Sequence, residues 1–376
     1  MSTTVPTATR VPLDRPLRAG VVGLGWAGQQ HMAAYDDLEG VELVGIAGME
    51  AEPLARLGEL YGVKHRVSTW QELVATHELD VISVATPTVL HAPIAIGALE
   101  AGIHVLSEKP MAETAEVGAR MVAAAEANDR VLDVSFNHRM RGDVQALKKI
   151  IDAGLLGNIY YAKAGWLRRE GIPGLGTWFT RAATSGGGPL MDIGVHMLDM
   201  ALYLLGEPEV RAATAATYAE FGPRGKGGSP YGPRRETQAA QFDVEDLSTA
   251  FLRLGEGGTL LLESSWAQWI PNDQCYVAVY GADGGASLEW GGEPKEPYRR
   301  LSIWTEIEGV PAELNPQAPP DGGHRGSVID FLAKVRSGDW AAHRGTVPLA
   351  RAKVVDACYA SARQGREVSL DGVPTA

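Results

Sequence analysis

Hydrophobic and polar residues follow two different patterns along this chain, and the pattern changes near Asn137. Before that point, short and almost continuously apolar runs alternate with longer runs of mixed polarity. The short runs are typical of strands buried on both faces, and the mixed runs are typical of helices. Strands that alternate with helices form right-handed βαβ units, which predicts a parallel sheet. The predicted strands are residues 18–22, 41–48, 64–69, 80–87, 103–110 and 130–136, and the predicted helices are residues 27–38, 53–61, 69–77, 91–102 and 112–129.

After Asn137 a helix is predicted over 145–154, and β patterns then dominate. Strands in succession that are joined by short turns predict a mostly antiparallel sheet. A long apolar helix, Gly186–Gly206, interrupts this sheet. The predicted strands are residues 158–169, 210–221, 241–254, 258–269, 274–281, 285–290 and 299–307, and two helices over 327–335 and 349–363 close the chain.

The predicted fold class is α/β, and a length of 376 residues suits two domains. We place the first domain at 17–138 and the second, which would bind substrate and form the oligomer, at 139–376. The terminal helix 349–363 is expected to pack back on the first domain. Residues 1–16 lack the apolar core of a signal peptide and are predicted to be a disordered leader. The Gly-, Pro- and Arg-rich stretch 221–236 is predicted to be a mobile loop.

Charge and composition narrow the possible partners. The net charge of −12 argues against nucleic acid and against an anionic membrane. No apolar run approaches the roughly 20 residues of a membrane span. Cys275 and Cys358 lack metal-ligand spacing and are predicted to be buried thiols, which fits a reducing, cytoplasmic compartment. A large sheet with an exposed face commonly buries it against a copy of itself, so we expect a homodimer or homotetramer.

The first motif with chemical meaning follows the first predicted strand. Gly23, Gly25 and Gly28 have the spacing G-x-G-x-x-G and stand between an apolar strand and a helix. In a dinucleotide-binding fold these glycines allow a tight turn, a close approach to the pyrophosphate and close packing of helix on strand. The amide groups at the start of the helix would then face the phosphates. By itself the spacing also fits a structural turn.

Thr86, Pro87 and His91 follow the strand 80–87, at an edge where open α/β sheets bind ligands. A helix-capping turn with a surface histidine is the alternative. Glu108, Lys109 and Pro110 end another strand. Partial burial would lower the pKa of such a lysine and let it carry a proton, whereas a surface Glu–Lys pair is the alternative.

Asp192 and His196 lie four residues apart, and therefore on the same face of the predicted helix. A neighbouring carboxylate holds the tautomer of a histidine and raises its basicity, so the pair could take a proton from a hydroxyl while hydride leaves the same carbon. The alternatives are a pair that only stabilises the helix around a core histidine, and a zinc site. No third ligand has a convincing spacing for zinc, so we expect no metal.

Taken together, these motifs resemble the glucose–fructose oxidoreductase / inositol dehydrogenase / rhizopine catabolism (Gfo/Idh/MocA) family. The resemblance runs from about Leu17 to Leu370 and includes the pattern GGGxxxDxGxH that ends at His196. It implies a Rossmann domain, a second α/β domain with a large open sheet, and assembly into dimers or tetramers. It also implies transfer of hydride between NAD(H) or NADP(H) and a secondary hydroxyl of a sugar, cyclitol or related polyol.

The resemblance also implies roles for individual residues. Lys109, Asp192 and His196 would be catalytic, with His196 as the acid–base group and Lys109 contacting the substrate. Arg168 and Trp178 are candidate sugar contacts from their position. The residues implied to contact the cofactor are Gly23, Gly25, Trp26, Ala27, Gly28, Gly48, Glu50, Thr86, Pro87, His91, Glu108, Lys109 and Asn137.

One position departs from the usual pattern. An NAD-selective site normally carries an acidic residue about 20 residues past the last glycine, and here Gly48 stands at that place. Neither an arginine nor a serine stands immediately beside Gly48 to bind a 2′-phosphate. Glu50 follows two residues later and disfavours a dianionic phosphate. The cofactor is therefore NAD or NADP, with a slight preference for NAD.

Two other functions remain open at this point. Some relatives retain the cofactor and cleave glycosides by transient oxidation at C3 followed by elimination. A nucleotide-bound sensor without catalytic activity would keep the glycine turn but would tolerate loss of Lys109, Asp192 and His196. All three are present here.

Overall fold

The computed structural model describes residues 15–229, 242–293 and 296–370. The chain divides into two compact units. The N-terminal unit runs to Ser135 and also includes His324–Leu349, and the C-terminal unit holds Phe136–Gly323 and the residues from Ala350 on. The predicted leader lies outside the described residues except for Arg15 and Pro16. The guanidinium of Arg15 donates two hydrogen bonds of 2.7 Å to Asp80.

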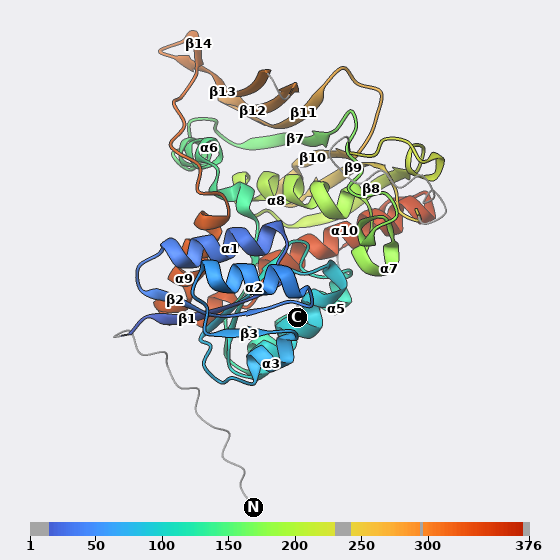
Figure 1. Cartoon of the computed structure of the whole chain (residues 1–376). Helices are drawn as coiled ribbons and strands as arrows, with labels where there is room; N and C mark the ends of the chain where they lie inside the picture. Colours follow the sequence, from blue (N-terminus) through green and yellow to red (C-terminus); the bar gives the residue numbers. More distant parts are fainter. Residues whose placement is uncertain (1–14, 230–241, 294–295, 371–376) are drawn as a thin grey trace, which may run out of the picture. The chain divides into compact units, whose positions relative to one another are not determined.

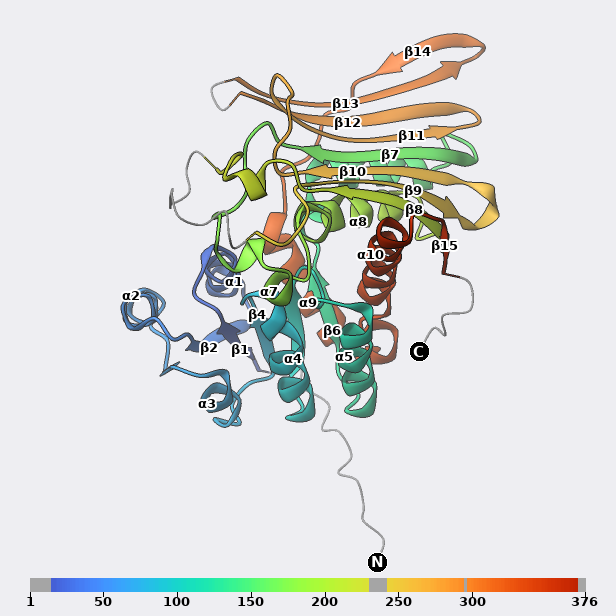
Figure 2. The ribbon, with the colours of Figure 1, turned by 90° about the vertical axis from the view of Figure 1, so that its right-hand side faces the viewer.

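The N-terminal unit is a parallel sheet between helices, as predicted. Within its described residues the six strands have the order β3-β2-β1-β4-β5-β6 (blue to teal in Figures 1 and 2). The strands are β1 (Leu17–Val22), β2 (Val41–Ala47), β3 (His65–Val67), β4 (Val81–Val84), β5 (His104–Glu108) and β6 (Leu132–Ser135). The helices are α1 (Trp26–Asp37), α2 (Ala51–Leu60), α3 (Trp70–Val74), α4 (His91–Glu100), α5 (Ala115–Ala127) and α9 (Gly323–Ser337), with short 3-10 turns η1 (Thr88–Leu90) and η8 (Trp340–His343).

Residues from a late part of the sequence complete the core of this unit. Phe331 and Leu332 of α9 are buried in one cluster with Met32 and Tyr35 of α1 and with β1. The segment 324–349, which the sequence pattern assigned to the second domain, therefore belongs to the N-terminal unit. Its apolar residues are buried in one cluster with those of α1 and β1, and local periodicity does not reveal this pairing.

The C-terminal unit contains a large sheet that is mostly antiparallel, as predicted. Within its described residues the nine strands have the order β14-β13-β12-β11-β7-β10-β9-β8-β15, and the pair β7–β10 is parallel. The strands are β7 (Ile159–Leu167), β8 (Val210–Tyr218), β9 (Leu247–Leu254), β10 (Thr259–Ser265), β11 (Asp273–Gly281), β12 (Gly284–Glu293), β13 (Glu296–Ile307), β14 (Val310–Leu314) and β15 (Val368–Ser369).

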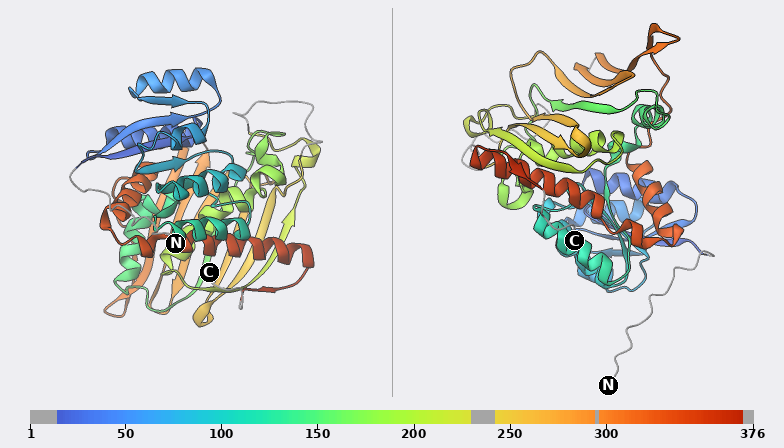
Figure 3. Two further views of the ribbon diagram at one scale, coloured as in Figure 1. Left: turned by 90° about the horizontal axis from the view of Figure 1, so that it is seen from below. Right: turned by 180° about the vertical axis from the view of Figure 1, so that it is seen from behind.

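Helices cover one face of this sheet, as Figures 2 and 3 show for α8 (Val195–Leu204) and α10 (Thr346–Gln364). A buried apolar row crosses the sheet beneath them and includes Ala164, Leu262 and Val277. The remaining helices and turns of the unit are α6 (Gly142–Asp152), α7 (Ala182–Ser185), η2 (Asn137–Met140), η3 (Trp178–Thr180), η4 (Leu190–Gly194), η5 (Gly222–Arg224) and η7 (Gly255–Gly257). Residues 230–236 of the predicted mobile loop lie outside the described residues.

The predicted helix Gly186–Gly206 is not continuous. α7 ends at Ser185, its C-cap Gly186 has φ +83°, and the π-helical turn η4 leads into α8. A Cβ on Gly187 would lie 2.0 Å from the hydroxyl of Tyr359, and a Cβ on Gly188 would lie 2.0 Å from the carbonyl oxygen of Glu245. The glycines are therefore needed for close packing of an irregular segment, which is why the helix begins only after them.

Candidate active site

The glycine-rich turn between β1 and α1 has the geometry of a dinucleotide-binding loop. Gly23 has φ +102°, and a Cβ there would lie 2.2 Å from the carbonyl oxygen of Ala85. A Cβ on Gly28 would lie 1.9 Å from the carbonyl oxygen of Gly23, whereas at Gly25 it would meet open space. Gly25 is the N-cap of α1 and has no side chain to satisfy the amide groups of the first turn, which begins with Trp26 and Ala27. The turn therefore fits a pyrophosphate.

The end of β2 explains why Gly48 carries no side chain. A Cβ on Gly48 would lie 2.4 Å from a methyl carbon of Leu24, which precedes Gly25 in the glycine turn. Glu50 is the N-cap of α2 and is exposed. The acidic group at this end of β2 therefore comes from Glu50, beyond the close contact between Gly48 and Leu24.

His91 connects two of the predicted site segments. Its ring is buried, with Nδ1 2.8 Å from the carbonyl oxygen of Pro110 and Nε2 2.9 Å from the carbonyl oxygen of Thr86. Burial lowers the pKa of His91, although both backbone contacts oppose that shift. The surface-histidine alternative is therefore wrong, because the ring is held between the Thr86–Pro87 turn and the turn after Lys109.

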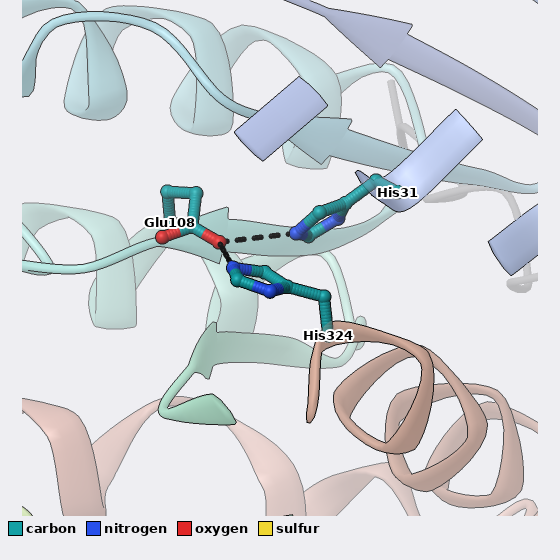
Figure 4. Close-up of side chains that lie close together, drawn as sticks. All are labelled: His31, Glu108 and His324. Atoms are coloured by element: carbon teal, nitrogen blue, oxygen red, sulfur yellow. Dashed lines mark hydrogen bonds and ion pairs between the residues drawn. The ribbon is translucent and has the colours of Figure 1, made fainter. Parts of the chain in front are cut away.

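Glu108 is also buried, which excludes the alternative of a surface Glu–Lys pair. Its Oε1 lies 3.1 Å from Nε2 of His31 and 3.5 Å from Nε2 of His324 (Figure 4). Its Oε2 accepts a hydrogen bond from the backbone N–H of Lys109. Burial by itself would raise the pKa of Glu108. The hydrogen bond from His31 and the nearby positive charges outweigh burial, so the pKa is lowered to about 2. The carboxylate is therefore ionised and fixes the start of the Lys109 turn.

This cluster also contains the donor set of a possible metal site. One ligand atom each from His31, Glu108 and His324 lie within 4.8 Å of one another. On the far side of His31, Nδ1 lies 2.8 Å from the hydroxyl of Ser83, which is 2.9 Å from the hydroxyl of Tyr35. The side chains of Tyr35, Ser83, His31 and Glu108 are thus connected by successive polar contacts.

In the C-terminal unit, Asp192 and His196 lie on consecutive helical turns, the first a π-helical turn and the second an α-helical turn. Asp192 belongs to the π-helical turn η4, and the buried His196 belongs to the first turn of α8. The indole N–H of Trp266 donates a hydrogen bond of 2.9 Å to Oδ2 of Asp192, and Trp266 is fully buried. π-Helical turns within helices often occur at functional sites, since they reorient side chains.

A second carboxylate holds this turn in place. Glu245 is buried and accepts hydrogen bonds of 3.0 Å from the backbone N–H groups of Gly188 and Leu190, and one of 2.8 Å from the hydroxyl of Tyr359. Burial raises the pKa of Glu245. The carboxylate satisfies amide groups at the start of η4 that have no helical partner.

Aromatic side chains surround His196. The ring of His138 lies 4.6 Å from that of His196 in an edge-to-face arrangement and 5.3 Å from Trp166. Trp290 stacks on His138 at 6.5 Å, and the guanidinium of Arg141 lies 3.8 Å from the centroid of Trp290. Trp166 and Trp290 face the same side of the sheet, since both pair with Cys275 across neighbouring strands. Flat rings beside a buried histidine suit a ligand that offers both C–H and hydroxyl groups.

The other predicted contacts of the substrate lie in the same unit. The guanidinium of Arg168 lies 5.2 Å from the centroid of Trp166, at the margin of the aromatic group. The ring of Trp178 stacks on Phe179 at 3.8 Å, in the turn η3. Asn137 begins η2 directly before His138 and therefore lies in the C-terminal unit, outside the unit that carries the glycine turn.

The sequence reasoning missed several residues of these sites. His31 stands three residues after Gly28, so it lies on the face of α1 that packs on the sheet, and this spacing could have identified it. His138 directly follows the candidate Asn137. No local signal links His324, Glu245 or Trp266 to the motifs, because they reach them only through the fold.

Two family profiles match the chain. Residues 17–136 match the oxidoreductase family with an NAD-binding Rossmann fold, and residues 144–287 match the Gfo/Idh/MocA C-terminal domain. The chain belongs to the Gfo/Idh/MocA oxidoreductase family. The match confirms the resemblance seen in the motifs, and with it an enzyme that uses a nicotinamide cofactor.

Individual relatives extend the comparison. The chain is 37% identical over 278 residues to the D-glucoside 3-dehydrogenase of Escherichia coli K12, which covers 73% of this chain and 77% of that protein. It is 30% identical over 282 residues to the levoglucosan dehydrogenase of Pseudarthrobacter phenanthrenivorans. This match covers 71% of this chain and 72% of that protein. A solved levoglucosan dehydrogenase complex with NADH has a TM-score of 0.80 at 24% identity and covers 96% of this chain and 100% of that one, which confirms the α/β fold. None of the described helices is both long and apolar enough to cross a membrane.

Proposed function

We propose that this protein transfers hydride between NAD(H) and a secondary hydroxyl of a sugar or related polyol. The observation that carries the proposal is the Asp192–His196 segment, which Trp266 and Glu245 hold in a fixed geometry in the C-terminal unit. The glycine turn of the N-terminal unit supplies the place for the dinucleotide. A sensor without catalysis has no need for an acid–base pair held in this way.

The residues of the chain would divide the work as follows. Bound NAD supplies the acceptor for hydride. His196 takes the proton from the substrate hydroxyl, and Asp192 keeps the imidazole in the required tautomer. Lys109, whose backbone is fixed by Glu108, contacts the substrate oxygen and passes charge during the reaction. Each role needs only a proton carrier or a hydrogen-bond donor, and all three side chains can provide one.

The surroundings of His196 support a carbohydrate as substrate. Trp166 and Trp290 provide flat apolar surfaces, and Arg141 and Arg168 provide guanidinium donors next to them. A sugar ring has weakly polar C–H faces and hydroxyl groups at its edge, which this combination matches. The names of the similar proteins, a D-glucoside 3-dehydrogenase and a levoglucosan dehydrogenase, point to the same substrate class.

The proposal is tested with a panel of sugars, glycosides and cyclitols, each with NAD⁺ and with NADP⁺, followed at the absorbance of the reduced nicotinamide. We expect reduction of NAD⁺ with at least one sugar or glycoside, and loss of it in His196→Ala. Activity with none of the panel, or full activity in His196→Ala with the best substrate, would contradict the proposal.

A second function is favoured by the similarity to a D-glucoside 3-dehydrogenase. Oxidation at C3 of a glycoside by bound NAD⁺ acidifies the C–H group at C2, which allows elimination of the aglycone from C1; water then adds at C1 and a proton at C2, and the hydride returns from NADH to C3. In that reaction a nitrophenyl glycoside would release nitrophenol without net formation of NADH. Accumulation of NADH without release of nitrophenol would identify the simple dehydrogenase instead.

We also propose that a second copy of the chain covers the exposed face of the large sheet. Tyr298 and Trp304 are large hydrophobic side chains that remain exposed on the face of the sheet opposite to Ala164 and Trp166. Light scattering after size-exclusion chromatography should give a dimer or a tetramer, and a monomer at micromolar concentration would contradict this.

A further inference from the structure

His324 is the second residue of α9. It is far from the cofactor motifs in the sequence, but it lies close to Trp26 and Glu108 in the fold. α9 is firmly placed, because Val328, Phe331 and Leu332 are buried in the core of the N-terminal unit. The side chain of His324 is only 10% exposed. Its position is therefore set by the core and not by an exposed loop.

His324 contacts the segment that would hold the dinucleotide and the segment that carries Lys109. Its ring lies 5.0 Å from that of Trp26, at an interplanar angle of 86°. Its Nε2 lies 3.5 Å from Oε1 of Glu108, the residue before Lys109 (Figure 4). Trp26 is the first residue of α1 and is 69% exposed, so most of the indole is open to a ligand bound at the glycine turn.

The contact between His324 and Glu108 is not required to compensate the buried charge of the carboxylate. His31 and the backbone N–H of Lys109 already give Glu108 two partners, which offset the cost of burying its charge. Burial lowers the pKa of His324, although Glu108 opposes that shift. His324 therefore adds a positional constraint on Glu108 that comes from a different part of the chain.

We propose that His324 is a positioning residue of the cofactor site, with two separate actions. Its ring holds the Trp26 indole against the glycine turn, and its Nε2 holds the Glu108 carboxylate from which the Lys109 turn begins. The inference rests on the proposed function for the role of Lys109, but its action on Trp26 depends only on dinucleotide binding.

A metal centre formed by His31, Glu108 and His324 is the competing explanation of the same cluster. The hydrogen bonds favour positioning. Nδ1 of His31 lies 2.8 Å from the Ser83 hydroxyl, which lies 2.9 Å from the Tyr35 hydroxyl, and Nε2 of His31 lies 3.1 Å from Oε1 of Glu108, so both ring nitrogens of His31 have polar partners within the protein. A metal bound at Nε2 of His31 would have to replace the 3.1 Å contact of that nitrogen with the Glu108 carboxylate.

Two substitutions at position 324 separate the two actions. His324→Gln loses the ring but keeps a donor that can reach Glu108, so the Kd for NADH should rise about 3- to 10-fold with kcat almost unchanged. His324→Phe keeps the ring but loses the donor, so kcat should fall about 10-fold while the Kd stays within about twofold. Trp26→Leu should reproduce the Kd change of His324→Gln, and adding His324→Gln to it should raise the Kd little further.

The matched control is His77→Gln, at an exposed turn of the same unit, which should change neither quantity. Kd is measured by energy transfer from tryptophan to NADH, and kcat is measured with the best sugar substrate. Thermal unfolding confirms that each variant is folded.

An unchanged Kd for NADH in His324→Gln overturns the inference even if the protein turns over no sugar. Equal effects of His324→Gln and His324→Phe on both quantities also overturn it. Stoichiometric zinc or another divalent metal in the purified protein, with NADH affinity lost on chelation, would overturn it in favour of the metal centre.

Discussion

The indole N–H of Trp266 donates a hydrogen bond of 2.9 Å to Oδ2 of Asp192, from a tryptophan that no solvent reaches. The bond uses one carboxylate oxygen and fixes the orientation of the other. Trp266 directly follows β10, so the large sheet itself sets the position of the proposed partner of His196.

Trp266→Phe should therefore reduce activity more than stability. Phenylalanine fills most of the buried space but gives no donor to Asp192, so kcat should fall about 10- to 100-fold as the Asp192–His196 geometry loosens. Steady-state kinetics measures this, with Trp269→Phe, at an exposed position of the same unit, as the control. A kcat equal to that of the wild type would show that the bond has no part in catalysis.

His196→Ala should lower kcat by about 10²- to 10⁴-fold, because it removes the proposed general base. The Kd for NADH should change little, since the glycine turn that would hold the pyrophosphate does not include His196. Asp192→Asn should have a smaller effect in the same direction and should shift the pH profile of kcat. A loss of NADH affinity equal to the loss of kcat would argue for a structural role of the histidine.

Glu50 should determine the preference for NAD over NADP. Its carboxylate stands near the end of β2, where the Leu24 contact keeps Gly48 without a side chain, and it would repel a 2′-phosphate. Glu50→Gln should lower the ratio of kcat/KM for NAD⁺ to that for NADP⁺ about 5- to 10-fold at low salt. Glu59→Gln, exposed near the other end of α2, is the control, and an unchanged ratio in Glu50→Gln would exclude Glu50 from the site.

Gly188→Ala should destabilise the protein and remove activity together. The new Cβ would lie 2.0 Å from the carbonyl oxygen of Glu245, so either the η4 turn or the backbone of Glu245 must move. We expect a loss of about 2–4 kcal/mol in the free energy of unfolding. Gly258→Ala meets no atom closer than 3.5 Å and should be nearly neutral. Denaturant unfolding compares the two variants, and equal stability would contradict the close packing.

Stability should fall as the pH drops below about 6.5. Burial lowers the pKa of His104 to about 3 and lowers that of His91 as well. Both side chains bind a proton near pH 6.5 when the chain is unfolded, so below that pH the unfolded state takes up more protons than the folded state. For His104 the loss between pH 8 and pH 5 is about 2 kcal/mol.

His104→Asn tests this effect. Nδ1 of His104 accepts a hydrogen bond from the backbone N–H of Val131, and the asparagine oxygen can take over that role without titrating. Unfolding free energies at pH 8, 6.5 and 5 should fall less steeply in His104→Asn than in the wild type. His77→Asn, at an exposed turn, should leave the slope unchanged, and equal slopes in all three proteins would contradict the assignment.

The pattern of apolar and polar residues within each segment predicted the two sheets, because the apolar residues of each strand are buried in the core of its own unit. The alternation of apolar runs predicted the parallel sheet, and the run of β patterns predicted the large sheet. The helix Gly186–Gly206 was predicted as continuous because periodicity does not register tertiary contacts. Tyr359 and Glu245, distant in sequence, decide that its first residues are irregular.

The sequence by itself determined the motifs, and through them the family: the glycine turn, Lys109, Asp192 and His196 are fixed by residue type and spacing. The tertiary structure alone decided what holds these residues. His324 reaches Glu108, Trp266 reaches Asp192, and His91 joins two turns, each across a long stretch of sequence. A motif is local because its backbone must take one conformation, whereas a buried polar side chain takes whichever partner the packed core brings within hydrogen-bonding distance.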